Sequence, residues 1–224
     1  MDMDLASVKR HVEESFAAVD ALADEMTVLR KLIYKNTSQH RRAQYFQYLL
    51  EVKRMHRALK KDDAKSMLHG AIKLLDLLTV TDSKHHVSWK VLGSNDTKAT
   101  LDAVLRQLQA YALGSVSAMD AASKAYRALG AQYAMTFFMP FCVVTTSLLG
   151  RLFTLQQTLL VRCVEAHHAL TLAYLAQTTL SNPFYANTVA VQLQSYQLDP
   201  NVVLPRLELR SLPQLVATTA SMSS

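Results

Sequence analysis

Apolar side chains recur every three or four residues along most of the chain, which is the spacing of one face of an α-helix. The first stripe covers residues 5–34 and comprises Leu5, Val8, Val12, Phe16, Val19, Leu22, Met26, Leu29 and Ile33. The opposite face of this predicted helix is acidic, at Glu13, Glu14, Asp20, Asp24 and Glu25. We interpret that face as the solvated side of a bundle helix; the alternative is that it steers phosphate groups toward a basic neighbour.

A second helix is predicted over residues 36–61, after a tight turn at residues 35–38. Asn36 stands in the N-cap place and Gln39 follows three residues on, as in a capping box. The side predicted to face the core carries Tyr45, Tyr48, Leu49, Val52, Met55 and Leu59. One flank is basic, with apolar side chains interleaved, and comprises Arg42, Phe46, Leu50, Lys53, Arg57, Lys60 and Lys61.

Three more helical segments are predicted further along. Residues 62–80 form a shorter helix, capped by Asp62 or Asp63, and residues 81–97 form a loop that Trp89 anchors. A helix starting near residue 97 runs to residue 129 as one helix or two, because internal glycines weaken it. Residues 128–150 carry no charge and are interpreted as a buried central helix that Pro140 kinks or restarts.

The fold class follows from these elements: all-α, an antiparallel bundle of four to six helices with an irregular Pro-containing C-terminal tail. The bundle domain is predicted over residues 1–181. Four of the five prolines lie in residues 182–224, which have little helical period and are predicted to be a tail with a disordered end.

Charge is concentrated in one part of the sequence. The chain carries +6, whereas residues 30–65 hold 11 Lys+Arg against 3 Asp+Glu. In the predicted second helix, His40, Arg41 and Arg42 fall in the first turn, where cations oppose the helix macrodipole. Their placement there indicates an anion held at the helix start, and the basic row is typical of a surface that binds a nucleic-acid backbone.

The signatures of common catalytic sites are absent from the sequence. It has no Gly-rich phosphate loop, GxSxG, CxxC or HExxH motif. Glu165 and His168 have the Glu-x-x-His spacing of di-iron bundles, but such sites need a second pair, and none occurs. Cys142 and Cys163 fit inert core positions. We therefore expect no enzyme activity, metal, cofactor or small-molecule substrate.

Several of these residues together resemble a known family. The segments IYKNTSQHRR (residues 33–42) and VKRMHR (residues 52–57), with Tyr45 and Phe46 between them, resemble the signature of the RNase MRP-specific protein subunit and its relative, the nucleolus and neural progenitor protein. Phe141 and the run LLGR (residues 148–151) add to the resemblance. It covers about residues 20–175 of the sequence.

The resemblance implies a helical, non-catalytic, RNA-binding subunit of the RNase MRP ribonucleoprotein, which processes precursor ribosomal RNA in the nucleolus of the nucleus. Its implied partners are RNase MRP RNA and other RNase MRP/RNase P proteins, with no membrane. Together with the basic flank, it gives the predicted RNA-binding residues: Lys35, Asn36, Gln39, His40, Arg41, Arg42, Phe46, Lys53, Arg54, Arg57, Lys60 and Lys61. Arg151 matches a family position and either touches RNA or supports the bundle.

Two other functions remain open from the sequence. A helical protein–protein scaffold without RNA contact would use apolar grooves and the tail. A single-pass membrane protein would use residues 128–150, whose length suits a bilayer although Pro140 and several polar side chains do not.

Overall fold

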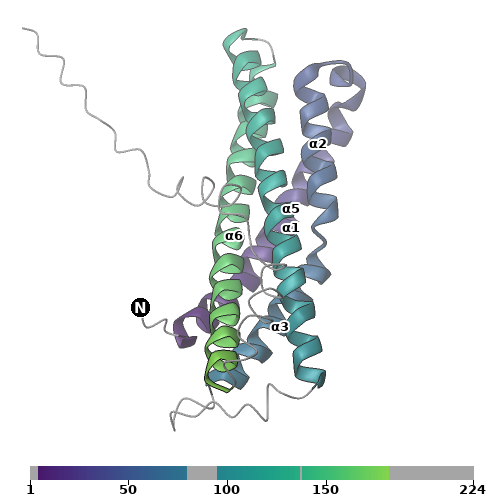
Figure 1. Ribbon diagram of the computed structural model, residues 1–224. Coiled ribbons are helices and arrows are strands. Elements are labelled where there is room, and N and C mark those ends of the chain that lie inside the picture. The colour runs from purple at the N-terminus through teal and green to yellow at the C-terminus, as the bar shows by residue number, and fades with distance from the viewer. Residues whose placement is uncertain (1–4, 80–94, 137, 182–224) are drawn as a thin grey trace, which may run out of the picture.

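The computed structural model describes residues 5–79, 95–136 and 138–181 and confirms an all-α fold. Five helices are present in these ranges: α1 (Leu5–His40), α2 (Gln44–Ala58), α3 (Lys61–Thr79), α5 (Asn95–Ala134) and α6 (Met139–Ser181). They form an elongated bundle in which α5 and α6 run antiparallel beside each other (Figure 1). The predicted loop with Trp89 lies mostly outside the described residues, and so does the tail over 182–224.

The boundary between the first two helices lies further along the chain than predicted. The side chain of Asn36 donates from Nδ2 to the carbonyl of Leu32 at 2.8 Å, and Thr37 donates from Oγ1 to Ile33 at 2.7 Å. Both side chains bond to the carbonyl four residues earlier, as polar side chains do inside a continuing helix. The predicted cap at Asn36 and turn at 35–38 are therefore wrong, because α1 continues to His40 and a short turn leads into α2.

The segment predicted as one helix or two is a single helix, α5, of 40 residues. Gly114 lies within α5, at the point where the C-terminal end of α2 packs against α5. A Cβ at Gly114 would stand 2.8 Å from Cδ2 of Leu59. The glycine thus allows the two helices to approach closely, which outweighs its weak helix propensity.

The uncharged run over residues 128–150 is not one buried helix, as predicted, but a helical hairpin tip. It forms the end of α5, a turn with positive φ at Thr136 (61°) and Phe138 (56°), and the start of α6. Pro140 is the second residue of α6, where its missing N–H leaves no helical bond unmade, so the restart predicted at Pro140 is confirmed. No helix within residues 5–79, 95–136 and 138–181 has the length and hydropathy that crossing a bilayer requires.

Besides a smaller cluster between α5 and α6, one large apolar core holds the long helices together. It contains side chains from every helix, and the fully buried members include Leu29 of α1, Leu49 of α2, Leu75 of α3, Leu108 of α5 and Leu152 of α6. Burial of each such side chain contributes roughly 1.5–3 kcal/mol. The stripes in the sequence predicted these faces because core packing, rather than local propensity, decides the register of amphipathic helices.

Candidate nucleic-acid interface

The basic residues lie on the hairpin of α1 and α2, whose turn is at the same end of the bundle as the α5–α6 turn (Figure 1). Within the described ranges, six of the predicted cations are exposed and have no carboxylate oxygen within 4.0 Å: Lys35, Arg41, Arg42, Lys53, Arg54 and Arg57. Other lysines do form salt bridges: Lys61 and Lys65 of α3 with Asp20, Lys9 of α1 with Asp76, and Lys124 of α5 with Glu51. The hairpin therefore presents positive charge that the described part of the fold does not neutralise.

The relation of these cations to the helix macrodipoles differs from the prediction. Arg41 and Arg42 follow the C-terminal end of α1 and precede α2, which begins at Gln44. Cations at a helix C-terminus interact favourably with its partial negative charge. Arg41 and Arg42 therefore lie between a helix end that favours cations and a helix start that disfavours them, so the macrodipoles do not by themselves explain these two arginines. What indicates an anion at this hairpin is the number of its exposed cations without a carboxylate within 4.0 Å in the described ranges.

His40, one of the predicted RNA-binding residues, is buried with 3% of its surface exposed. Its Nδ1 lies 2.6 Å from the hydroxyl of Tyr45, and its ring lies edge-on to Phe138, with centroids 4.6 Å apart. Burial lowers the pKa of the imidazole, which favours the neutral form. His40 therefore joins the two turns at this end of the bundle.

Phe46, the aromatic residue predicted on the basic flank, is fully buried in the core. A stacking role for Phe46 is therefore wrong, because no base can reach its ring. Asn36 is half-buried and uses its amide within α1, whereas Gln39 is exposed. Tyr34 was not among the predicted RNA-binding residues; it is 84% exposed and follows the buried Ile33. The helical period could have revealed it, since Tyr34 falls outside the apolar stripe of its helix.

Lys60 and Lys61 are exposed but have acidic neighbours. Lys61 Nζ lies 2.6 Å from Asp20 Oδ1, and Lys65 Nζ lies 2.8 Å from the same oxygen. Hydrogen bonds from these two lysines lower the pKa of the Asp20 carboxyl. Lys60 lies 4.0 Å from Asp63. Part of the basic row predicted for RNA thus contributes to the packing of α3 on α1.

Arg151 supports the bundle. Its guanidinium lies 2.5 Å from Oε1 of Glu25, which joins α6 to α1, and the Glu25 side chain is only 13% exposed. Glu25 and Asp20 both belong to the face of α1 predicted to be solvated. Asp20 pairs with α3 but keeps 46% of its side chain exposed, so that prediction is wrong only for Glu25, whose carboxylate is largely buried in its ion pair with α6. It is right for Glu13, Glu14 and Asp24, which are exposed.

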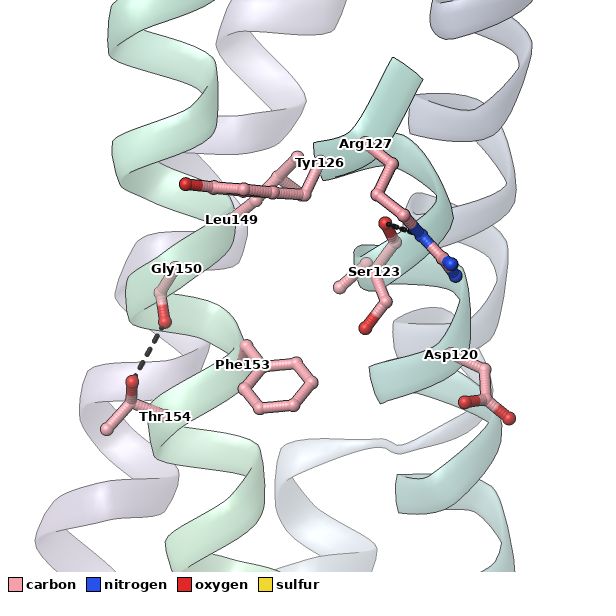
Figure 2. A pocket seen from close by; sticks show the side chains of 9 residues that line it. Asp120, Ser123, Tyr126, Arg127, Leu149, Gly150, Phe153 and Thr154 are labelled. Carbon is pink, nitrogen blue, oxygen red and sulfur yellow. Dashed lines mark hydrogen bonds between the residues drawn. The ribbon is translucent and has the colours of Figure 1, made fainter. Parts of the chain in front are cut away.

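A separate hollow of about 570 Å³ lies between α5 and α6. Figure 2 shows Tyr126 and Phe153 on opposite sides of this hollow, with Asp120 and Arg127 on the α5 side. The Arg127 Nε donates to the carbonyl of Ser123 at 3.3 Å. None of its lining residues is a cysteine or histidine, so a nucleophile paired with a histidine base is absent from this hollow.

Metal-binding and thiol chemistry have little support in the part of the chain described here. In those residues no three His, Cys, Asp or Glu side chains group in a way that could hold a metal ion. Glu165 instead accepts a hydrogen bond from Arg162 at 2.8 Å. Burial raises the pKa of the Cys163 thiol to about 12, which disfavours the reactive thiolate.

Comparison with known proteins gives one family. No curated protein and no solved structure matches the chain. A family model described as nucleolus and neural progenitor protein, N-terminal, matches residues 1–171, which include the whole basic hairpin and most of α6. Since this match covers well over half of the chain, the protein belongs to the family of the nucleolus and neural progenitor protein N-terminal region.

Proposed function

We propose that this protein is a non-catalytic, RNA-binding subunit of the RNase MRP ribonucleoprotein and acts in precursor ribosomal RNA processing in the nucleolus. The observation that carries the proposal is the group of exposed cations on the α1–α2 hairpin without carboxylate neighbours in the described ranges. The family name supports the nucleolar assignment. The resemblance of residues 33–42 and 52–57 to the RNase MRP-specific subunit supports the assignment to the RNase MRP ribonucleoprotein.

The chemistry of the hairpin suits an RNA backbone. Arginine and lysine bind phosphate through charge-assisted hydrogen bonds, and releasing counterions from RNA adds to the affinity. Tyr34 offers an exposed aromatic ring one residue before Lys35, so an unpaired base can stack while neighbouring phosphates meet the cations. These contacts require exposed side chains on a rigid support, which the packed hairpin supplies.

A protein–protein scaffold is the second candidate, and a specific surface favours it. The tip of the α5–α6 hairpin exposes large apolar side chains that the described bundle leaves uncovered: Met135, Phe138, Met139, Val143 and Val144. Exposed apolar side chains grouped in this way indicate contact with another macromolecule. In an assembled particle, the basic hairpin and this tip can serve RNA and protein partners at the same time.

Affinity purification followed by sequencing of the bound RNA tests the proposal. The tagged chain is compared with a variant in which Arg41, Arg42, Lys53 and Arg54 are all replaced by Gln. We expect the unchanged protein to recover one abundant structured RNA together with RNase MRP proteins, and the variant to recover less of that RNA. Recovery of proteins without any enriched RNA would favour the scaffold.

A further inference from the structure

A second cavity lies where α1, α2 and α3 meet, close to the end of α2 and the start of α3. Its volume is about 490 Å³. Apolar side chains of α1 form part of its wall, including Leu22 and Met26. Basic side chains from the three helices and from the α2–α3 connection also line the cavity: Arg30 of α1, Arg57 of α2, Lys60 of the connection and Lys61 of α3. The fold thus brings cations that are distant in sequence around one hollow.

His56 lines the same cavity and is buried, with 5% of its surface exposed. Its Nδ1 lies 3.1 Å from the carbonyl of Val52, which accounts for one ring nitrogen. Nε2 is buried and has no hydrogen-bond partner among the described residues. A buried polar atom without a partner is unfavourable, and a group bound in the cavity would give Nε2 the partner that the described residues do not supply.

The two arginines of the cavity have no acidic partner in the described part of the chain. Arg30 and Arg57 are exposed, and neither has a carboxylate oxygen within 4.0 Å there. Arg30 is close enough to His56 to disfavour a positive charge on the imidazole. Two guanidinium groups and an imidazole around one hollow repel one another whenever all are charged, and a bound anion removes that repulsion.

Acidic side chains near the cavity limit which anion fits. Lys61 is held by Asp20 at 2.6 Å, and Asp62 also lines the wall. A small anion such as free phosphate therefore contacts only the cations of the cavity that have no acidic partner. A polyanion also reaches Lys53 and Arg54 further along α2, where no carboxylate within the described ranges competes. The charge distribution favours a chain of phosphates over a free phosphate ion.

We propose that this cavity binds one backbone phosphate of an RNA strand, held between Arg30 and Arg57. Guanidinium groups bind phosphate oxygens in bidentate geometry. The negative charge of the bound phosphate favours the protonated form of His56, whose Nε2 then donates to another oxygen. The adjacent phosphates continue along α2 to Arg54 and Lys53. This inference rests on the RNA-binding function proposed above, and it adds Arg30 and His56 to the residues that contact RNA.

Binding of a fluorescein-labelled RNA stem-loop with single-stranded flanks to the full chain tests the cavity, by fluorescence anisotropy over a range of salt concentrations. The test variant combines Arg30→Gln and Arg57→Gln. The matched control combines Arg10→Gln and Lys73→Gln, which remove the same charge at exposed positions of α1 and α3 away from the cavity. We expect the test variant to bind roughly tenfold or more weakly than the control, with a salt slope smaller by about 1.

A second arm measures the melting temperature with inorganic phosphate against chloride at equal ionic strength. Equal RNA affinity for the test and control variants overturns the cavity assignment, while RNA binding by the hairpin stands. If the unchanged chain does not bind the RNA, the proposed function fails for the free protein. In that case, a phosphate-dependent rise in melting temperature that only the test variant loses identifies a free-anion site and overturns the RNA assignment.

Discussion

The imidazole of His40 stacks on the ring of Phe141, with centroids 4.8 Å apart and an interplanar angle of 24°. This contact fastens the α1–α2 turn to the first turn of α6. Replacing His40 with Ala removes the stacking and leaves the Tyr45 hydroxyl without its partner at 2.6 Å. We expect a loss of about 2–4 kcal/mol in the free energy of unfolding.

Urea denaturation of the His40→Ala variant measures this loss. Arg41→Ala serves as the control, because Arg41 is exposed at the next position and its truncation should change stability by less than about 0.5 kcal/mol. Equal stability of the two variants would show that the aromatic contact does not hold the turns together.

The same histidine predicts a pH dependence of stability. Burial lowers the pKa of both His40 and His56 below the ordinary value of 6.5, so the unfolded chain binds protons more readily than the folded chain. The stabilisation is complete above pH 6.5 and decreases as the pH falls below that value toward the folded pKa values. Denaturation midpoints measured across this range should decline, and the decline should be smaller in His40→Gln.

An exposed histidine provides the contrast for that pH series. His168 lies on the surface of α6 and is not part of the buried clusters. His168→Gln should leave the slope of stability against pH as it is in the unchanged protein. A slope that His168→Gln reduces as much as His40→Gln does would contradict burial as the cause.

Two glycines of the long helices should respond in different ways to alanine. At Gly150 of α6 a Cβ meets no atom within 4 Å, so Gly150→Ala should raise the free energy of unfolding by about 0.4–1 kcal/mol through better helix propensity. At Gly114 a Cβ would press on Leu59, and part or all of that gain should be lost. Thermal melts of the two variants compare them directly; an equal rise in both would mean that the Leu59 side chain moves aside at little cost.

Arg151 should affect the bundle and not RNA affinity. Its ion pair with Glu25 has one exposed and one largely buried partner. A double-mutant cycle with Arg151→Gln and Glu25→Gln should therefore give a coupling energy of about 1 kcal/mol, at the upper end for surface pairs. RNA affinity of Arg151→Gln should equal that of the unchanged protein, and a clear loss would place Arg151 at the RNA.

The helices before residue 128 were predictable because each has a continuous apolar stripe, and those stripes became the core. The turn between α5 and α6 was not, because the uncharged run over residues 128–150 is apolar on most sides. The start of α2 was not, because Asn36 can either cap a new helix or bond back to Leu32 within the old one. Packing of His40 on Phe141, far along the chain, favours the second outcome. Likewise, the basic character of residues 30–65 was visible in the sequence, whereas the grouping of Arg30 with Arg57 depends on how α1 and α2 align.

Tyr34 and Phe46 provide the sharpest test of which aromatic residue serves RNA. Tyr34 is 84% exposed, so Tyr34→Ala should leave stability nearly unchanged. If its ring stacks on a base, RNA affinity should decrease by roughly 1–3 kcal/mol. The salt slope should stay constant, because stacking neutralises no phosphate.

Phe46→Ala should instead destabilise the fold by about 3–5 kcal/mol, since Phe46 is fully buried. Anisotropy titrations and urea denaturation of both variants separate the two roles, and unchanged affinity in Tyr34→Ala would exclude stacking at that position.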